Sequence, residues 1–192
     1  MRKIIIFLIA ALFGVASLSV VSGAHADPPS SIGPPDTGMH TWCGPDPSKW
    51  LYTLANNAAS GAANQTVVDV AYQASCSSTT DVKWAWESSS TAAYGSAQCM
   101  IRRSNGRCDQ YKVLLYKKAI NASPHPSSQE RKTSCHELGH TLGVSHYSGS
   151  SKPGGDTSHS CLRSGKVPNP NKSWHTKYGT HHKTVHINPW FS

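Results

Sequence analysis

The sequence predicts an α+β fold, in which strands come first, a long helix follows and the last part of the chain is irregular. Apolar and polar residues alternate over residues 82–87, and residues 111–116 are rich in strand-forming side chains. A helical pattern then extends from about residue 129 to residue 142. After residue 146 the chain is rich in Gly, Ser, Pro and Lys until about residue 173. A cleft is expected between a larger N-terminal part and a smaller C-terminal part.

The first 26 residues have the pattern of a secretory signal peptide. Arg2 and Lys3 form a basic start, Ile4 to Val21 is apolar, and Ala24-His25-Ala26 has the A-x-A form of a cleavage site. An uncleaved membrane anchor is the alternative, because the apolar run is close to the shortest bilayer span. No second basic cluster directly follows the site, and no other long apolar segment exists. We therefore expect a secreted, soluble protein with no stable membrane anchor.

The remaining chain fits one domain preceded by a short leader. Residues 27–42 include a stretch rich in proline, glycine and serine, which predicts a flexible leader or short pro-segment, and residues 43–192 form the domain. Residues 50–75 are Ala-rich and compatible with a helix. The candidate buried positions of that segment are Leu51, Leu54, Ala58, Val67, Val70 and Ala71.

The strands and the second half of the chain follow from periodicity and turn residues. Val82, Trp84 and Trp86 alternate with more polar positions, as in a strand with one buried face. Residues 121–128 contain two prolines and predict a loop. Ser127 or Ser128 can then cap the next helix. A last short helix is expected over residues 178–186.

Charge restricts the classes of partner. The formal net charge is +8, and it falls to +6 when Arg2 and Lys3 leave with the signal peptide. Such a surface suits acidic polymers or substrates, although a soluble basic surface is the commoner meaning. The basic residues are scattered and no recognition motif accompanies them, so we expect no nucleic-acid partner. A monomer is expected.

One motif carries specific chemistry. Residues 136–146 read H-E-x-x-H-x-x-G-x-x-H, and its H-E-x-x-H core is a zinc-hydrolase signature. On a helix, His136 and His140 lie on one face and can bind one Zn²⁺ ion. Glu137 can reach a water on that ion. Gly143 lets the chain leave the helix, because glycine adopts positive φ at little cost, and His146 can then arrive as a third ligand.

The identity of the third ligand depends on the residues beyond this helix. Some H-E-x-x-H enzymes use a later glutamate, but this chain has no glutamate after Glu137 and only one aspartate, Asp156. His146 is the expected third ligand, with Asp156 or another histidine as alternatives. His159 and His175 are the weaker candidates of that kind. His181, His182 and His186 form a second candidate metal cluster, although surface or core positions are commoner for such residues.

The long motif resembles that of the metzincin metallopeptidases. The flanking residues 131–135 and 160–165 and the end of the chain, 181–188, extend the likeness to small secreted bacterial metzincin-like proteins. The resemblance implies a mixed sheet and an active-site helix over a smaller, irregular C-terminal subdomain. It also implies a methionine in a turn beneath the metal, and here Leu162 occupies that position.

Six cysteines in an exported chain predict disulfides, with fifteen complete pairings. Cys99 and Cys108 flank the turn signal Asn105-Gly106 and are expected to pair. Pairing of Cys135 with Cys161 would tie the metal helix to the turn beneath it, which leaves Cys43 with Cys76. As an alternative, Cys43 could block the zinc as a thiolate, as similar segments do in matrix metallopeptidases.

These features favour a secreted zinc-dependent endopeptidase acting on a protein or peptide substrate. Zinc would be held by His136, His140 and His146, with Glu137 as general base. Two alternatives remain open: a zinc-stabilised protein that binds a surface partner without catalysis, and a zinc amidase acting on cell-wall peptides.

Overall fold

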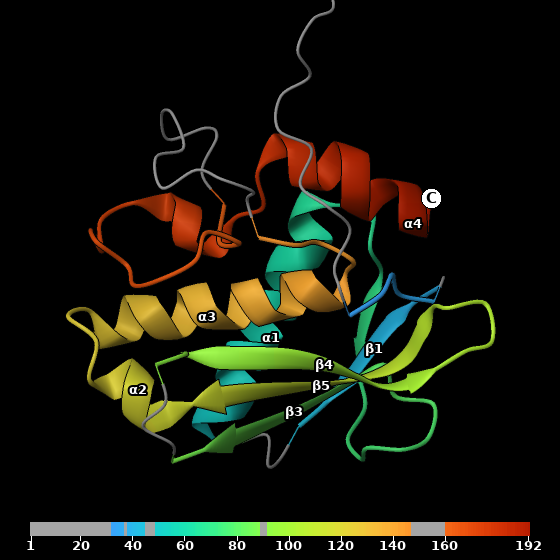
Figure 1. Ribbon diagram of the computed structural model, residues 1–192, viewed down its shortest axis with the longest axis horizontal. Helices are drawn as coiled ribbons and strands as arrows, with labels where there is room; N and C mark the ends of the chain where they lie inside the picture. The colour runs from blue at the N-terminus through green and yellow to red at the C-terminus, as the bar shows by residue number, and fades with distance from the viewer. Residues whose placement is uncertain (1–31, 37, 45–48, 89–91, 147–159) are drawn as a thin grey trace, which may run out of the picture.

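The computed structural model describes residues 32–36, 38–44, 49–88, 92–146 and 160–192. Their centre is a five-stranded mixed sheet, with helices packed on one face (Figure 1). The strand order is β2 (Val70–Tyr72), β1 (His40–Cys43), β3 (Val82–Glu87), β5 (Cys108–Tyr116), β4 (Gly95–Arg102). The first four are mutually parallel, whereas the edge strand β4 is antiparallel to β5. The predicted α+β class with a mixed sheet is confirmed.

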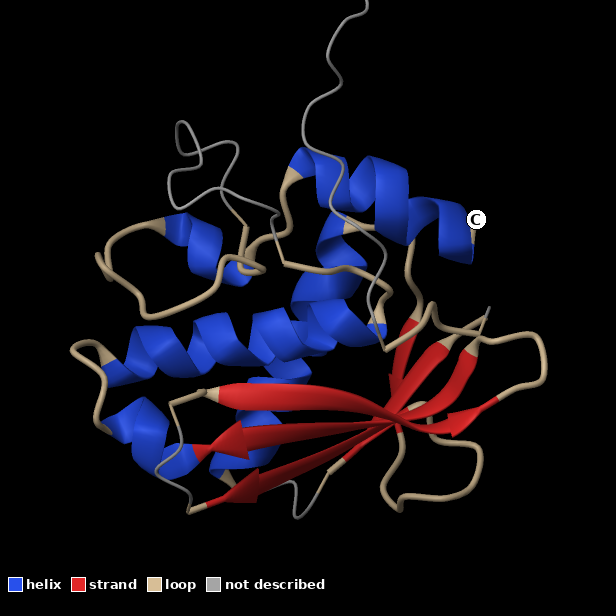
Figure 2. Cartoon of the chain, viewed as in Figure 1, coloured by secondary structure: helices blue, strands red, loops and turns tan. Residues whose placement is uncertain are grey.

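Two long helices cover the sheet and contact each other. They are α1 (Trp50–Gln65) and α3 (Pro126–Thr141), and the short α2 (Lys117–Asn121) joins β5 to α3. The C-terminal part packs above α3 with little regular structure (Figure 2). Its elements are a 3₁₀ turn, η1 (Ser173–Thr176), a π-helix, η2 (His182–Ile187), and α4 (Asn188–Phe191). Among the described residues, no helix combines the length and the apolar character that crossing a bilayer requires.

The core lies between the sheet and the two long helices. Strand β5 includes the predicted strand over residues 111–116, and its Tyr111, Val113 and Leu115 are fully buried. Val82 and Trp84 of β3 are buried as well, but Trp86 is 46% exposed, near the end of the strand. There the ammonium of Lys117 lies 5.2 Å from the centre of the Trp86 ring, an exposed cation–π contact.

Helix α1 is shorter than the Ala-rich segment predicts. It ends at Gln65, and the amide and hydroxyl of Thr66 both donate to the carbonyl of Ala62. Residues 70–72 then form β2, which pairs in parallel with β1, so a helix over 50–75 is wrong beyond residue 65. The exposure of Val67, 50%, is also contrary to expectation, whereas its neighbour Val68 is buried. The β-branched side chains in this segment favour the strand.

The leader predicted over residues 27–42 is part of the fold where the structure describes it. Residues 40–42 belong to β1, an inner strand of the sheet. Upstream, Pro35 forms a parallel bridge with Cys108, and the Tyr111 hydroxyl donates to the Gly33 carbonyl at 3.1 Å. The flexible-leader prediction is therefore wrong for residues 32–36 and 40–42. The predicted signal peptide, 1–26, lies outside the described residues.

Two helix boundaries differ from the sequence prediction. Helix α3 begins at Pro126, and neither Ser127 nor Ser128 caps it. Proline suits the first turn because its missing N–H would have no helical acceptor there. The last helical stretch extends over η2 and α4, so it begins and ends later than the predicted 178–186.

All six cysteines form the three expected disulfides: Cys43–Cys76, Cys99–Cys108 and Cys135–Cys161. The first of them rules out Cys43 as a zinc-blocking thiolate. Disulfides persist in oxidising compartments, so the three pairs are consistent with an extracellular protein.

Candidate metal centre

Helix α3 and the turn after it bring three histidines together. His136 and His140 are one turn apart, with ring centres 4.7 Å apart. The helix ends in a Schellman motif: the Val144 amide donates to Gly139 and the Gly143 amide to His140, at 3.1 and 3.2 Å. Gly143 has φ +86°, which a residue with a side chain rarely adopts. This reversal places His146 beside the two helical histidines.

The three Nε2 atoms converge on one point. Nε2 of His146 lies 2.9 Å from that of His136 and 3.1 Å from that of His140. One nitrogen from each ring falls within a 4.8 Å group able to hold a metal ion. Three nitrogens at zinc's usual bond length, with tetrahedral angles, would be about 3.3 Å apart. The observed separations are close to that value, so the residues fit an ion of this size.

Backbone carbonyls fix which nitrogen of each helical histidine carries the proton. Nδ1 of His136 lies 2.8 Å from the Cys161 oxygen, and Nδ1 of His140 lies 2.7 Å from the Val144 oxygen. A carbonyl oxygen only accepts, so both Nδ1 atoms donate and both Nε2 atoms keep a lone pair for the shared point. Such outer contacts orient metal-ligating histidines and raise their basicity.

Burial keeps the three imidazoles neutral, which is the form that binds metal. It lowers the pKa of His140 to about 4 and that of His136 well below the usual value. The pKa of His146 is also lowered, first by burial and then by the positive charge of Lys132.

Glu137 lies beside this group and is 5% exposed. Burial raises the pKa of its carboxyl to about 8, and the ammonium of Lys132 opposes that rise. Its side chain packs against β4 at Gly95, where a Cβ would lie 2.9 Å from the Glu137 Oε1 atom. Glycine at this edge position therefore leaves the space that the carboxylate occupies.

The three histidines and Glu137 line a cleft of about 390 Å³. Its other lining residues include 94–97, mostly of β4, Lys132 and Thr133 on α3, and Ser164 and Gly165. The metal-binding group is thus open to the cleft on one side, unlike a structural site closed by four protein ligands.

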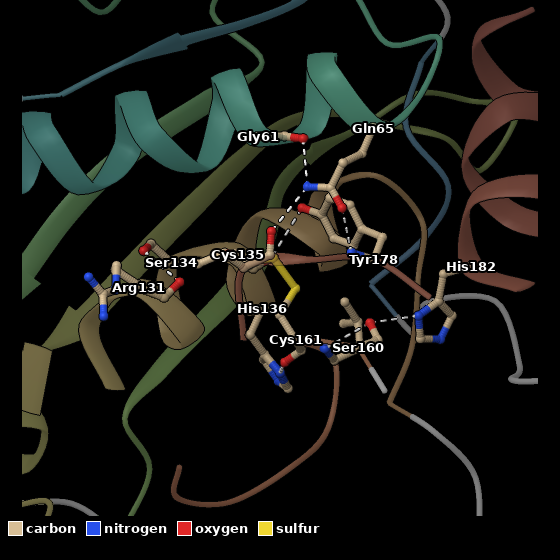
Figure 3. Close-up of a disulfide and its surroundings, with 12 residues drawn as sticks. Gly61, Gln65, Arg131, Ser134, Cys135, His136, Ser160, Cys161, Tyr178 and His182 are labelled. Atoms are coloured by element: carbon tan, nitrogen blue, oxygen red, sulfur yellow. Dashed lines mark hydrogen bonds between the residues drawn. A yellow bond between two sulfur atoms is a disulfide. The ribbon is translucent and has the colours of Figure 1, made fainter. Parts of the chain in front are cut away.

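The turn beneath the histidines is fastened at several points (Figure 3). The disulfide Cys135–Cys161 ties it to α3, directly before His136. Leu162 is fully buried against Gly139, where an added Cβ would lie 2.7 Å from its Cδ2 atom. The Ser160 hydroxyl accepts from the Leu162 amide at 3.2 Å and lies 2.9 Å from Nδ1 of the buried His182.

None of the other candidate metal ligands that the structure describes belongs to this group of three histidines. Asp156 and His159 lie outside the described residues. His175 is buried against Trp174, with ring centres 5.5 Å apart, and does not join the three histidines. Among the described residues, the cluster 181, 182 and 186 does not form a comparable metal-binding group. Sequence reasoning gave Lys132 no role of its own and did not predict the contact of His182 with Ser160, because both depend on partners far along the chain.

Comparison with known proteins identifies no family. No protein-family model matches the chain, and no curated protein does. A structural comparison aligns it with a chain of the GM1-bound form of the ECX AB5 holotoxin, with a TM-score of 0.39 and 16% sequence identity. The match covers 58% of this chain and 54% of that one, so the alignment spans about half of each. A similarity at this level carries no conclusion about fold or activity.

Proposed function

We propose that this protein is an exported zinc-dependent endopeptidase of the metzincin type. The observation that carries the proposal is the convergence of three histidine Nε2 atoms at one face of a cleft that also contains a buried carboxylate. A structural metal site needs no such carboxylate, and it is usually closed by four protein ligands and not open to a cleft. Both features are required when a metal-bound water attacks a substrate.

The residues divide the work of peptide hydrolysis. His136, His140 and His146 hold the ion as neutral ligands, and zinc so bound would lower the pKa of a water towards about 7 and polarise a carbonyl. Glu137 accepts the proton of the attacking water and delivers it to the leaving amine. Burial raises the pKa of this carboxyl, which favours the protonated form that delivers the proton to the amine.

The edge strand that lines the cleft supports a peptide as substrate. Strand β4 is at the edge of the sheet, and its residues 95–97 line the cleft opposite α3. An extended peptide can pair with the backbone of such an edge and place one carbonyl over the histidines.

Two other functions make different predictions. A zinc-stabilised binding protein would not need Glu137, and a cell-wall amidase would cleave muropeptides in preference to casein or gelatin. The test is incubation of zinc-loaded protein with a diverse peptide library, with and without a chelator, for the wild type and for Glu137→Gln. General-base loss costs about 10²–10⁴-fold in rate, so the variant should keep its zinc and lose most hydrolysis. Equal cleavage by the two proteins would contradict the proposal.

A further inference from the structure

A buried lysine shares the cleft with the candidate metal centre. Lys132 is 3% exposed, lines the cleft and precedes His136 by four residues on α3. Side chains with this spacing lie on the same helix face, about 5–6 Å apart at Cβ. The lysine is therefore one helical turn from the first metal ligand.

The described residues satisfy the hydrogen-bonding capacity of this ammonium only in part. An ammonium has three N–H donors. One of them reaches the Gly165 carbonyl at 3.2 Å, and this is the one acceptor that the described residues offer it. The Glu137 carboxylate attracts the ammonium through space, without a hydrogen bond between the two among the described residues. A buried cation with unused donors in a cleft is costly unless an anion completes it.

The surroundings of Lys132 favour a carboxylate as that anion. Thr133, Ser164 and Gly165 line the cleft with it and carry no charge. Glu137 is committed to the proton transfers of the proposed reaction, and a zinc ion would add a second positive charge nearby. Among the described residues no other carboxylate takes this position, whereas a substrate can bring a negative group to it each time it binds.

We propose that Lys132 recognises a carboxylate on the substrate residue next to the scissile bond. The short distance along α3 between Lys132 and His136 restricts that carboxylate to a residue adjacent to the reacting carbonyl. It can belong to an aspartate or glutamate side chain or to a free C-terminus, and both present the same chemistry. This inference rests on the proposed peptidase function and specifies its substrate class.

The competing explanation is purely structural: Lys132 ties α3 to the turn at Gly165 and plays no part in recognition. Matched substrates separate the two explanations without any mutation. A peptide cleaved by the wild type is remade with Glu, Gln, Asp or Asn on either side of the scissile bond, and with a free or amidated C-terminus there. A hydrogen bond to a charged group contributes about 1.5–3 kcal/mol, so kcat/KM should be about 10- to 100-fold higher for the carboxylate member of a pair.

Three variants then assign the preference to Lys132. Lys132→Met should remove it, chiefly by lowering kcat/KM for the acidic peptides, while Lys132→Arg, which keeps the charge, should retain most of it. Lys118→Met, the same change at an exposed lysine of α2, should cleave like the wild type. Zinc content and the far-ultraviolet circular dichroism spectrum check that each variant is folded.

Binding separates failure of this inference from failure of the proposed function. Zinc-loaded Glu137→Gln protein is titrated with the same peptides, labelled with a fluorophore, and the acidic member should bind about 10-fold or more tightly. Equal binding and equal cleavage within every pair would overturn the role of Lys132 and leave the peptidase proposal intact. Tighter binding of acidic peptides without any hydrolysis by the wild type would support Lys132 and overturn the peptidase.

Discussion

Gly139 provides the sharpest test of how the centre is packed. In an exposed helix interior, replacing glycine by alanine stabilises the helix by about 1 kcal/mol. At Gly139 the added Cβ would lie 2.7 Å from Cδ2 of Leu162 and 3.0 Å from Cε1 of Tyr178. Neither neighbour moves easily, since both are buried and the Tyr178 hydroxyl donates to the Cys135 carbonyl at 3.1 Å. Overpacking of this kind costs about 1–3 kcal/mol.

The expected result is a loss of stability and of metal affinity. Gly139→Ala should lower the free energy of unfolding by up to about 2 kcal/mol, once the helix propensity gain is set against the overpacking cost. Pushing Leu162 away also moves the Cys161 carbonyl that accepts from His136 Nδ1, so zinc affinity should fall about 10-fold or more. Urea unfolding with the disulfides intact measures the first effect, and competition with a chromophoric chelator measures the second.

Gly61 of α1 supplies the matched control. Its added Cβ would meet only Gln65 Nε2, at 3.7 Å, so Gly61→Ala should stabilise the protein by about 0.5–1 kcal/mol. The double variant Gly139→Ala with Leu162→Ala should be about 1–3 kcal/mol more stable than the summed effects of the two single substitutions predict. The reason is that the methyl group added by Gly139→Ala fills part of the cavity that Leu162→Ala leaves. If Gly139→Ala is as stable as Gly61→Ala and binds zinc like the wild type, the described packing is wrong.

Further tests probe the turn beneath the histidines and one buried histidine outside the site. Leu162→Met conserves volume, so it should lower the free energy of unfolding by under about 1.5 kcal/mol and leave zinc affinity unchanged. Leu162→Ser should lower both the stability and the zinc affinity. Equal behaviour of the two variants would show that this side chain does not support the centre. His182→Ala removes the ring that contacts Ser160 and should lower zinc affinity about 10-fold, because the turn beneath the histidines becomes less rigid. The same chelator competition measures this affinity. An unchanged affinity would show that His182 does not help to position the ligands. Burial lowers the pKa of His40 to about 4, so the unfolded chain binds the proton at a higher pH than the folded protein does. The free energy of unfolding that His40 contributes is therefore fully present above about pH 6.5 and is lost as the pH falls towards 4. The loss should be about 2–3 kcal/mol between pH 7 and 4.5. The three histidines of the candidate centre add to the pH dependence of metal-free protein, so the difference between wild type and His40→Gln isolates the share of His40. Urea unfolding of metal-free protein at the two pH values should show a loss in the wild type that exceeds the loss in His40→Gln by about 2–3 kcal/mol, and equal losses would contradict it.

Sequence reasoning succeeded where the determinants are local. The spacing of His136 and His140 on a helix, and the need for positive φ at Gly143, follow from backbone geometry within eleven residues. The strand over residues 111–116 is rich in aromatic and branched side chains, so its local composition predicts it. By contrast, β4 was missed because it is an edge strand: most of its residues are partly or fully exposed, and no alternation marks it.

The missed parts of the site share a different cause, which is distance along the chain. Lys132 meets Gly165 across 33 residues, and His182 meets Ser160 across 22. Each looks like an ordinary polar residue until the chain is folded, since a lysine on a helix usually extends into solvent. What makes Lys132 unusual is the turn that buries it, and that turn is held in place by Cys135–Cys161. The disulfide thus connects the motif to the wall of the cleft: the bond that fixes the Cys161 carbonyl behind His136 also places Gly165 against the Lys132 ammonium. A ligand set read from eleven residues therefore predicts the chemistry proposed for the centre, whereas the proposed selectivity depends on contacts that only the tertiary fold creates.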